Sequence, residues 1–548
     1  MINFLKVWAS YHPYEAFGMG WREFAGQIPN YSLLRLQTYR HFLLMTQKSL
    51  ESINFAGLTE ISKIDFLVLQ NKILADLFNI DDLKSYTTNP LTYVDLAFIF
   101  DFLLKKYAPL SQRIKELSFH LRQLPEFYSI ATKNLLWQDC APEHAEVTMK
   151  MLQGMIPFLK NIENEIKELE ADNDRIDEQV LQDVNEAKEI AIDAINRFIE
   201  ELKAHLSEMK ASYRLGKTLF TKMLITNERV ELPLEKILEA GEKNLEQNLA
   251  ELKKAANQID PNRSIEEITE EIRKDHPTTE SLMPDISKML IDLRQYLIDS
   301  NFVSIPSEVM PKVMLTPKPF REWVFAAMET PGPLEKKATE SYYYITPPDD
   351  EWTEKEKEEW LETFNYRGLL DISAHEAFPG HYLHHLHNQR SKSLMSKIFG
   401  AYHFWEGYAL YIEEALWQIG FQKGDYKYRI AQLFETLLRN VRLIVAIKLH
   451  TDENFSLEDA TQMFMKHAFL GRKPSESEAK RATFDPGYLN YALGKLLVEK
   501  LRTDYEEERG DSFKLKDFHD ELLSFGAPPI PILRQFMLQN EAKHSDIL

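Results

Sequence analysis

The segment from Asp371 to His385 concentrates residues that bind metal ions and move protons. It reads DISAHEAFPGHYLHH and holds four of the sixteen histidines in the chain. A histidine followed directly by glutamate, with another histidine about one helical turn later, begins the metal site of many zinc hydrolases. In such sites the imidazoles hold the metal and the glutamate takes a proton from water. The segment therefore predicts metal ligands at His375 and His381, with Glu376 as the general base.

The spacing differs from the usual H-E-x-x-H, because four residues rather than two separate the glutamate from the second histidine. On a straight helix, at about 100° per residue, His381 would point well away from His375. Pro379 has no N–H to donate, and Gly380 tolerates unusual backbone angles. We therefore predict a kink or bulge between Ala377 and His381 that turns the second imidazole back. If the helix were straight, the second ligand would instead have to be Tyr382, His384 or His385.

A second segment, from Trp405 to Glu414, supplies carboxylates at a suitable distance along the chain. It reads WEGYALYIEE, and the seven-residue spacing of Glu406 and Glu413 places both on one face of a helix. A glutamate from a following helix is a common third ligand, and two histidines with one carboxylate leave the fourth position of zinc open. We therefore predict that Zn²⁺ is bound by both histidines of the first motif and by Glu406. Glu413, two turns deeper, would orient one of the ligands.

These two motifs resemble a bacterial family known as domain of unknown function 885. Its members carry a pattern close to H-E-A-x-P-G-H-H-x-Q followed by E-G-W-A-L-Y, where this chain reads HEAFPGHYLH and EGYALY. Further matches are PYEAFG at residues 13–18, RLGK at 214–217, and a C-terminal stretch with Arg481, Pro486, Gly487, Tyr491 and Gly494. The resemblance therefore covers most of the chain.

The sequence also departs from the family pattern at three places. Tyr382 replaces a common histidine, and His384 stands where glutamine is usual. An Asp-x-Gly-x-His stretch that often follows the glutamate helix reads AIKLH here and ends at His450. These departures predict a different choice of substrate, while the metal-binding residues are intact.

The family is similar to the helical zinc peptidases, such as thimet oligopeptidase and angiotensin-converting enzyme. The resemblance implies a mainly α, large two-lobed helical zincin-like body with a deep cleft and a small β-sheet beside the metal site. It implies one family-type unit over residues 1–548, with a mostly helical N-terminal lobe at 1–300. The sheet and the metal-site helices would then occupy 301–548.

Composition limits the partners and the compartment. The net charge of the 548 residues is −20 and there is no long Lys/Arg tract, which argues against a nucleic-acid or anionic-membrane partner. The single cysteine, Cys140, excludes a disulfide framework and a cysteine-built zinc site, and we expect a buried thiol. The N-terminus shows neither a signal peptide nor a membrane span, which predicts a cytoplasmic location.

The rest of the chain predicts helices with one small sheet. Apolar residues recur at three- and four-residue steps through residues 1–135, and two long charged helices at 143–210 should form a hairpin with a break near Asp172. Within a proline-rich stretch, Val309–Thr316 and Ser341–Thr346 read as short strands. An edge strand there would pair with an extended peptide, or the strands would serve structure alone.

Helices return after residue 354. Residues 352–366 lead into a helix through the motif, and a helix around Glu406 follows. Two more helices are predicted at 428–450 and 457–466, and residues 471–483 read as a loop.

The reaction that best fits these residues is peptide hydrolysis. Zinc would polarise the scissile carbonyl and activate water, and Glu376 would pass the proton to the leaving amine. A metal-dependent amidase acting on a small non-peptide substrate would use the same atoms. The third possibility is a non-catalytic helical scaffold. The presence of Glu376 argues against it, because a scaffold needs no general base.

The C-terminal stretch from Arg481 to Gly494 adds candidates for transition-state binding. A tyrosine hydroxyl suits the oxyanion because it donates without carrying charge, and the family resemblance favours Tyr491. Tyr488 and His450 are the other candidates for this donor. Arg481 would grip a peptide carboxylate through two parallel hydrogen bonds.

Overall fold

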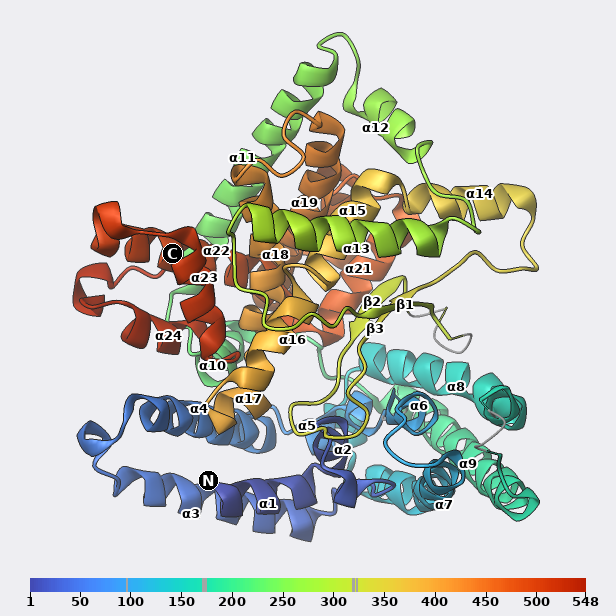
Figure 1. The fold of residues 1–548 in the computed structure, drawn as a ribbon. Helices are drawn as coiled ribbons and strands as arrows, with labels where there is room; N and C mark the ends of the chain where they lie inside the picture. The colour runs from blue at the N-terminus through green and yellow to red at the C-terminus, as the bar shows by residue number, and fades with distance from the viewer. Residues whose placement is uncertain (95–96, 170–174, 318–320, 322–323) are drawn as a thin grey trace. The chain divides into compact units, whose positions relative to one another are not determined.

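The computed structural model describes residues 1–94, 97–169, 175–317, 321 and 324–548. The chain forms two compact units, each assembled from segments that are separate in sequence. Unit 1 comprises residues 1–55, 72–215 and 331–339, and unit 2 comprises residues 56–71, 216–330 and 340–548. Figure 1 shows that helices make up most of both units, which confirms the predicted mainly α class.

Unit 1 is built from helices that pack along one another. They are α1 (Ile2–Tyr11), α2 (Pro13–Gly18), α3 (Leu33–Glu51), α5 (Ser85–Thr88), α6 (Ala97–Leu104), α7 (Leu110–Asn134), α8 (Pro142–Glu168) and α9 (Glu178–His205). α4 (Glu60–Leu77) begins in unit 2 and ends in unit 1. α9 contacts both α7 and α8, as expected for the predicted hairpin. The predicted break near Asp172 lies outside the described residues.

The single cysteine lies in unit 1, just before α8. Cys140 is buried, as predicted. Burial raises the pKa of its thiol to about 12. The thiol is therefore protonated at neutral pH and is a poor nucleophile.

Unit 2 carries the motif helices and the sheet. Its helices are α10 (Gly216–Glu228), α11 (Leu234–Ile259), α12 (Ile265–Arg273), α13 (Leu282–Asp299), α14 (Glu354–Thr363), α15 (Tyr366–Glu376), α16 (His381–Arg390), α17 (Leu394–Ile398), α18 (Tyr402–Gln418), α19 (Tyr426–Thr451), α20 (Leu457–His467), α21 (Arg472–Phe484), α22 (Asn490–Arg509), α23 (Leu515–Ser524) and α24 (Ile530–Met537). The prediction of a loop at 471–483 is wrong, because α21 fills this range. Pro474 lies in the first turn of α21, where a missing N–H breaks no helical hydrogen bond.

Side-chain caps define where the helices of the site begin. The side chain of Asn365 accepts a hydrogen bond of 2.9 Å from the backbone N–H of Gly368 and so starts α15. The carboxylate of Asp425 accepts from the N–H groups of Lys427 and Tyr428 at the start of α19. Such caps satisfy amides that have no partner within the helix.

The sheet has three strands in the order β1-β3-β2. β1 (Lys312–Leu315) and β3 (Tyr342–Ile345) confirm the two predicted strands, and they pair in parallel. β2 (Ala326–Glu329) pairs antiparallel with β3, with Met328 opposite Tyr343. The sequence AAME of β2 lacks the β-branched and aromatic residues that mark a strand, so the pattern did not predict it. Within the sheet, β2 is an edge strand.

Two glycines allow α18 and α22 to pack closely. A Cβ atom added to Gly407 would lie 2.4 Å from the Cα atom of Gly494. One added to Gly494 would lie 1.9 Å from the carbonyl oxygen of His403. Only glycine fits such an approach. The close packing brings the first turn of α22, with Tyr491, beside the first turn of α18.

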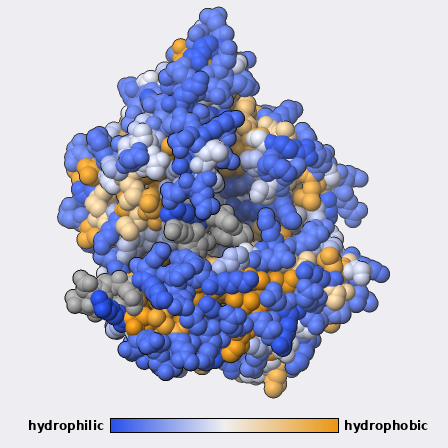
Figure 2. Space-filling view, turned by 90° about the vertical axis from the view of Figure 1, so that its right-hand side faces the viewer, coloured by the Kyte–Doolittle hydropathy of each residue, from blue (hydrophilic) through white to orange (hydrophobic). Residues whose placement is uncertain are grey.

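The surface is largely polar. Figure 2 shows that most of the face drawn is hydrophilic, with hydrophobic residues gathered in separate patches, in line with a charged fraction of 27%. In the part of the chain that the structure describes, no helix is both long enough and apolar enough to span a bilayer.

Candidate metal centre

The helix that carries the first motif is broken between the two histidines, which confirms the predicted distortion. α15 ends at Glu376 and α16 begins at His381. Gly380 sits directly on the end of α15, where an added Cβ atom would lie 1.6 Å from the carbonyl oxygen of His375. The distortion is therefore a complete break rather than a bend. It places the imidazoles of His375 and His381 edge to face, with ring centroids 4.9 Å apart.

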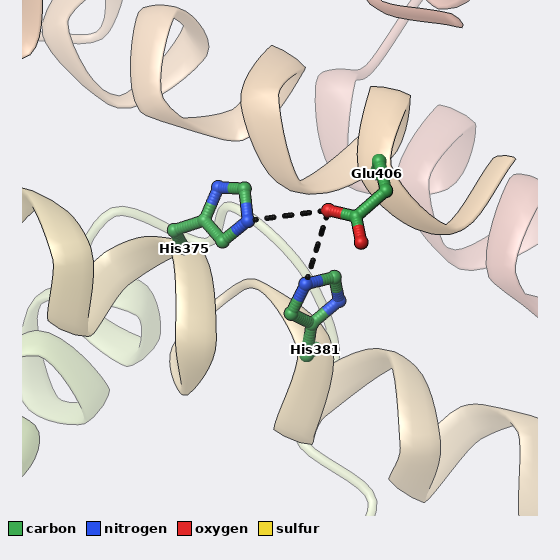
Figure 3. Close-up of side chains that lie close together, drawn as sticks. All are labelled: His375, His381 and Glu406. Carbon is green, nitrogen blue, oxygen red and sulfur yellow. Dashed lines mark ion pairs between the residues drawn. The ribbon is translucent and has the colours of Figure 1, made fainter. Parts of the chain in front are cut away.

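Glu406 of α18 points one carboxylate oxygen toward both imidazoles, as Figure 3 shows. Its Oε2 atom is 3.6 Å from Nε2 of His375 and 3.6 Å from Nε2 of His381. One ligand atom from each residue lies within 4.8 Å of the other two. Ligand atoms about 2.1 Å from a tetrahedral zinc are roughly 3.4 Å apart. The three residues therefore fit a single zinc ion.

The charges in this cluster suit a bound cation. Burial would raise the pKa of Glu406, but the two neighbouring histidines hold it well below its usual value. Burial would lower the pKa of His375, but Glu406 and Glu413 hold it well above its usual value. The carboxylates therefore favour positive charge at this position, whether on a proton or on a metal ion.

Glu413 stands behind His375, the candidate ligand that the sequence predicted it to orient. Its Oε1 atom is 2.7 Å from Nδ1 of His375, and its side chain is 1% exposed. A carboxylate accepts hydrogen bonds, so Nδ1 of His375 carries the proton and Nε2 is directed at Glu406. This contact fixes both the tautomer and the ring orientation of His375.

Asp371 and Tyr428, to which the sequence assigned no role, form a second buried contact in this region. Asp371 is one turn before His375 and is fully buried. Burial and the nearby charge of Glu413 raise the pKa of Asp371 well above its usual value. The hydroxyl of Tyr428 donates to Oδ1 of Asp371 at 3.2 Å. The motif contained Asp371, but only the fold shows that Tyr428 contacts it.

Removing the carboxylate behind His375 should weaken metal binding. We expect Glu413→Ala to lower zinc affinity by about 10- to 100-fold, the usual effect of losing such a partner. Competition with a chromophoric chelator measures this affinity. Glu414→Ala is the matched control, because it removes the next acid of α18, which pairs with Arg429 instead. Equal affinities in the two variants would contradict the assigned role of Glu413.

Glu376 lies at the end of α15 and is not one of the three clustered ligands. Its Oε2 atom accepts a hydrogen bond of 2.9 Å from the backbone N–H of Met328 in β2. The edge strand therefore fixes the carboxylate that we assigned as the general base. No sequence signal pointed to Met328, since β2 itself was not predicted.

Of the three candidates for the oxyanion donor, Tyr491 has the available hydroxyl. Its ring packs edge-on against Tyr402, with centroids 5.8 Å apart, and Tyr402 is one turn before Glu406 in α18. Within the described residues, the Tyr491 hydroxyl makes no hydrogen bond. Tyr488 is fully buried, and Nε2 of His450 donates to the carbonyl oxygen of Ala482 at 2.8 Å.

Arg481 already has a carboxylate partner. Its Nε and Nη2 atoms donate to Oδ2 of Asp485 at 3.0 and 2.8 Å. Nη2 also lies 3.3 Å from the hydroxyl of Tyr402. The two-nitrogen edge that would grip a substrate carboxylate is therefore occupied by a residue four positions further along the chain.

Two solved structures share this fold over nearly the full length. One is a candidate lipoprotein of unknown function from Shewanella oneidensis, 22% identical, with a TM-score of 0.82 and 98% of each chain covered. The other is a candidate lipoprotein from Colwellia psychrerythraea, 17% identical, with a TM-score of 0.80, covering 98% of this chain and 97% of that one. Among proteins with curated functions, none matches the sequence.

These neighbours overturn the prediction of a cytoplasmic location. Both are described as candidate lipoproteins, a class of proteins anchored to membranes by lipid and found outside the cytoplasm. A lipid anchor requires no apolar transmembrane helix. The missing membrane span was therefore no argument for the cytoplasm, and we withdraw the prediction.

The resemblance seen in the two motifs extends along the chain. The family model described as "bacterial protein of unknown function (DUF885)" matches residues 13–537. This range contains all three candidate ligands and the candidate general base. The chain therefore belongs to the DUF885 family.

Proposed function

We propose that this protein is a zinc-dependent peptidase that hydrolyses peptide bonds of oligopeptides. The observation that carries the proposal is the convergence of His375, His381 and Glu406, with ligand atoms within 4.8 Å of one another. Two histidines and one carboxylate leave a coordination position open, as catalytic rather than structural zinc sites do. A two-lobed zincin-like body with a deep cleft belongs to the same proposal.

The residues around the ligands have roles that suit this reaction. Bound zinc would supply Lewis-acid activation of the scissile carbonyl and of water. Glu376, held by the Met328 amide at 2.9 Å, would accept the proton and deliver it to the leaving amine. Tyr491 would donate its hydroxyl to the developing oxyanion.

The edge strand favours a peptide over a small amide. β2 pairs only with β3 within the sheet, and its Met328 contacts Glu376 directly. An extended peptide can add to such an edge through backbone hydrogen bonds. The scissile bond of a bound peptide would then lie beside the general base. A small amide would gain nothing from the strand.

The metal site is tested by removing its ligands one at a time. We expect the His375→Ala and Glu406→Ala variants to lose zinc, because two remaining ligands bind an ion weakly. Elemental analysis of protein purified without chelator gives the metal content. His385→Ala is the matched control, since His385 is a buried histidine of the same motif outside the cluster. Full zinc content in both ligand variants would reject the site.

The activity is tested with peptides. Zinc-loaded protein is incubated with a mixed peptide library, and mass spectrometry identifies the cut bonds. Cleavage that disappears after chelation and returns with zinc would support the proposal. An uncut peptide library together with cleaved small amides would favour the amidase instead.

A further inference from the structure

Three arginines gather around Tyr488, just before α22, and Tyr491, in the first turn of α22. Arg439 and Arg442 are three residues apart on α19, and their guanidinium carbons lie 5.9 and 5.2 Å from the ring centroid of Tyr491. The guanidinium carbon of Arg481, from α21, lies 5.7 Å from the ring centroid of Tyr488. Helices α19 and α21 thus bring three positive charges to one place.

Two of the three arginines are neutralised through the same edge of the guanidinium group. Arg442 donates from Nε and Nη2 to the carboxylate of Glu478, at 2.8 and 2.7 Å. Arg481 uses the same two nitrogens on Asp485, at 3.0 and 2.8 Å. This edge is the one that matches a carboxylate with two parallel hydrogen bonds.

Arg439 differs from its neighbours in this respect. It contacts Glu435 through Nη1 alone, in an ion pair with the carboxylate and a 3.2 Å hydrogen bond to the carbonyl oxygen. Its Nε atom is buried and has no partner among the residues that the structure describes. Its Nη2 atom makes no hydrogen bond within the part of the chain that the structure describes. The side chain is 14% exposed, and the edge of Arg439 that suits a carboxylate has no partner among the described residues.

Arg439 also lies near the metal ligands. Burial and the charge of Arg442 lower the pKa of Arg439, while the carboxylates of Glu413 and Glu406 act in the opposite direction. The Tyr491 ring that Arg439 contacts packs against Tyr402, with centroids 5.8 Å apart, and Tyr402 is one turn before Glu406 in α18. Arginine keeps its charge even when buried. A fixed positive charge is therefore placed beside Tyr491 and the candidate zinc site.

We propose that Arg439 binds a carboxylate of the substrate, through its Nε and Nη2 edge, next to the bond that is cleaved. The inference rests on the proposed peptidase function and replaces Arg481 as the carboxylate-binding residue. The carboxylate is either the C-terminal one or the side chain of an acidic residue. The first source makes the protein an enzyme that trims peptides from the C-terminus, and the second makes it selective for acidic sequences.

Binding separates the two sources without relying on turnover. Protein carrying Glu376→Gln is dialysed against pentapeptide libraries of neutral residues in three forms, and mass spectrometry quantifies the retained peptides. The forms are a free C-terminus, a C-terminal amide, and a C-terminal amide with one glutamate. The measurement is made on zinc-loaded and on chelator-treated protein, so that a carboxylate bound by the metal is recognised.

We expect retention of a carboxylate-bearing form to exceed that of the neutral amide by about 10- to 100-fold, the effect of hydrogen bonds to a charged group. Preference for the free C-terminus alone assigns the C-terminal carboxylate, and preference for the glutamate form assigns the side chain. Arg439→Gln should abolish the preference in both the zinc-loaded and the metal-free protein. Arg439→Lys, which keeps the charge but loses the two-nitrogen edge, should retain part of it.

Arg429→Gln is the matched control. Arg429 lies on the same helix and is buried, but it pairs with Glu414. Its loss should leave the carboxylate preference unchanged. Equal retention of all three forms, or an unchanged preference in Arg439→Gln, would overturn the inference. A carboxylate preference that depends on Arg439, in a protein that cuts no peptide, would instead reject the peptidase and keep the binding site.

Discussion

The Glu376→Gln variant is expected to keep its zinc and to lose about 10²–10⁴-fold in kcat, the usual contribution of a general base. Glutamine preserves the shape of the side chain, and its amide oxygen can still accept the hydrogen bond that Met328 donates at 2.9 Å. It cannot take a proton from water at neutral pH. Because Glu376 is outside the ligand cluster, the substitution removes the base and leaves the metal site intact.

The measurement combines elemental analysis with kcat for a peptide identified from the library. Glu359→Gln is a suitable control, because this glutamate of the preceding helix α14 is 61% exposed and should not affect turnover. Turnover near the parent rate in Glu376→Gln would remove Glu376 as the base. Loss of zinc together with activity would show that Glu376 contributes to metal binding.

The local part of the site was predictable because its signals lie within two short segments of the chain. Pro379 and Gly380 cannot continue α15 with normal hydrogen bonding, so the unusual histidine spacing and the helix break followed from the same residues. The spacing of Glu406 and Glu413 likewise fixed which face of α18 meets the histidines. Periodicity predicted α19 nearly to its observed ends, Tyr426 and Thr451.

The remaining contacts depend on residues far apart in the sequence. The amide of Met328 reaches Glu376 only because β2 pairs with β3, and the short AAME segment gives no strand signal. The pairing of Arg481 with Asp485 was visible only once α21 placed the two on one helical face. From the sequence alone, Arg481 was a candidate for binding a substrate carboxylate. In the fold, Asp485 occupies the Nε and Nη2 edge of Arg481, whereas the same edge of Arg439 has no partner among the described residues.

The close packing of α18 and α22 could not be predicted from the sequence. Gly407 and Gly494 were noted only as parts of family patterns. A chain pattern does not show that the two glycines meet each other. In the structure a Cβ atom on Gly407 would lie 2.4 Å from Gly494. That approach brings the start of α22, with Tyr491, against the start of α18, with Tyr402.

Replacing Tyr491 with phenylalanine should therefore lower kcat by about 10²–10³-fold, the effect of removing one oxyanion donor, with little change in zinc content. The ring contacts would remain, since Tyr402 packs against the ring edge-on at 5.8 Å and Arg442 lies 5.2 Å from its centroid. Only the hydroxyl is lost, and it has no hydrogen bond within the described residues to be disrupted. A fall in kcat with an unchanged KM would identify an interaction made in the transition state.

Tyr488→Phe is the matched control, because Tyr488 lies three residues earlier and its buried hydroxyl has no partner in the described part of the chain. Removing that hydroxyl leaves no hydrogen-bonding group unsatisfied, so activity and stability should both be kept. The pair of variants separates a catalytic hydroxyl from a general disturbance at the start of α22. If Tyr491→Phe turns over peptides at the parent rate while Tyr488→Phe does not, the donor is Tyr488, which would have to become exposed when substrate binds. If neither variant loses activity, the donor is a different group, and His450 is the next to replace.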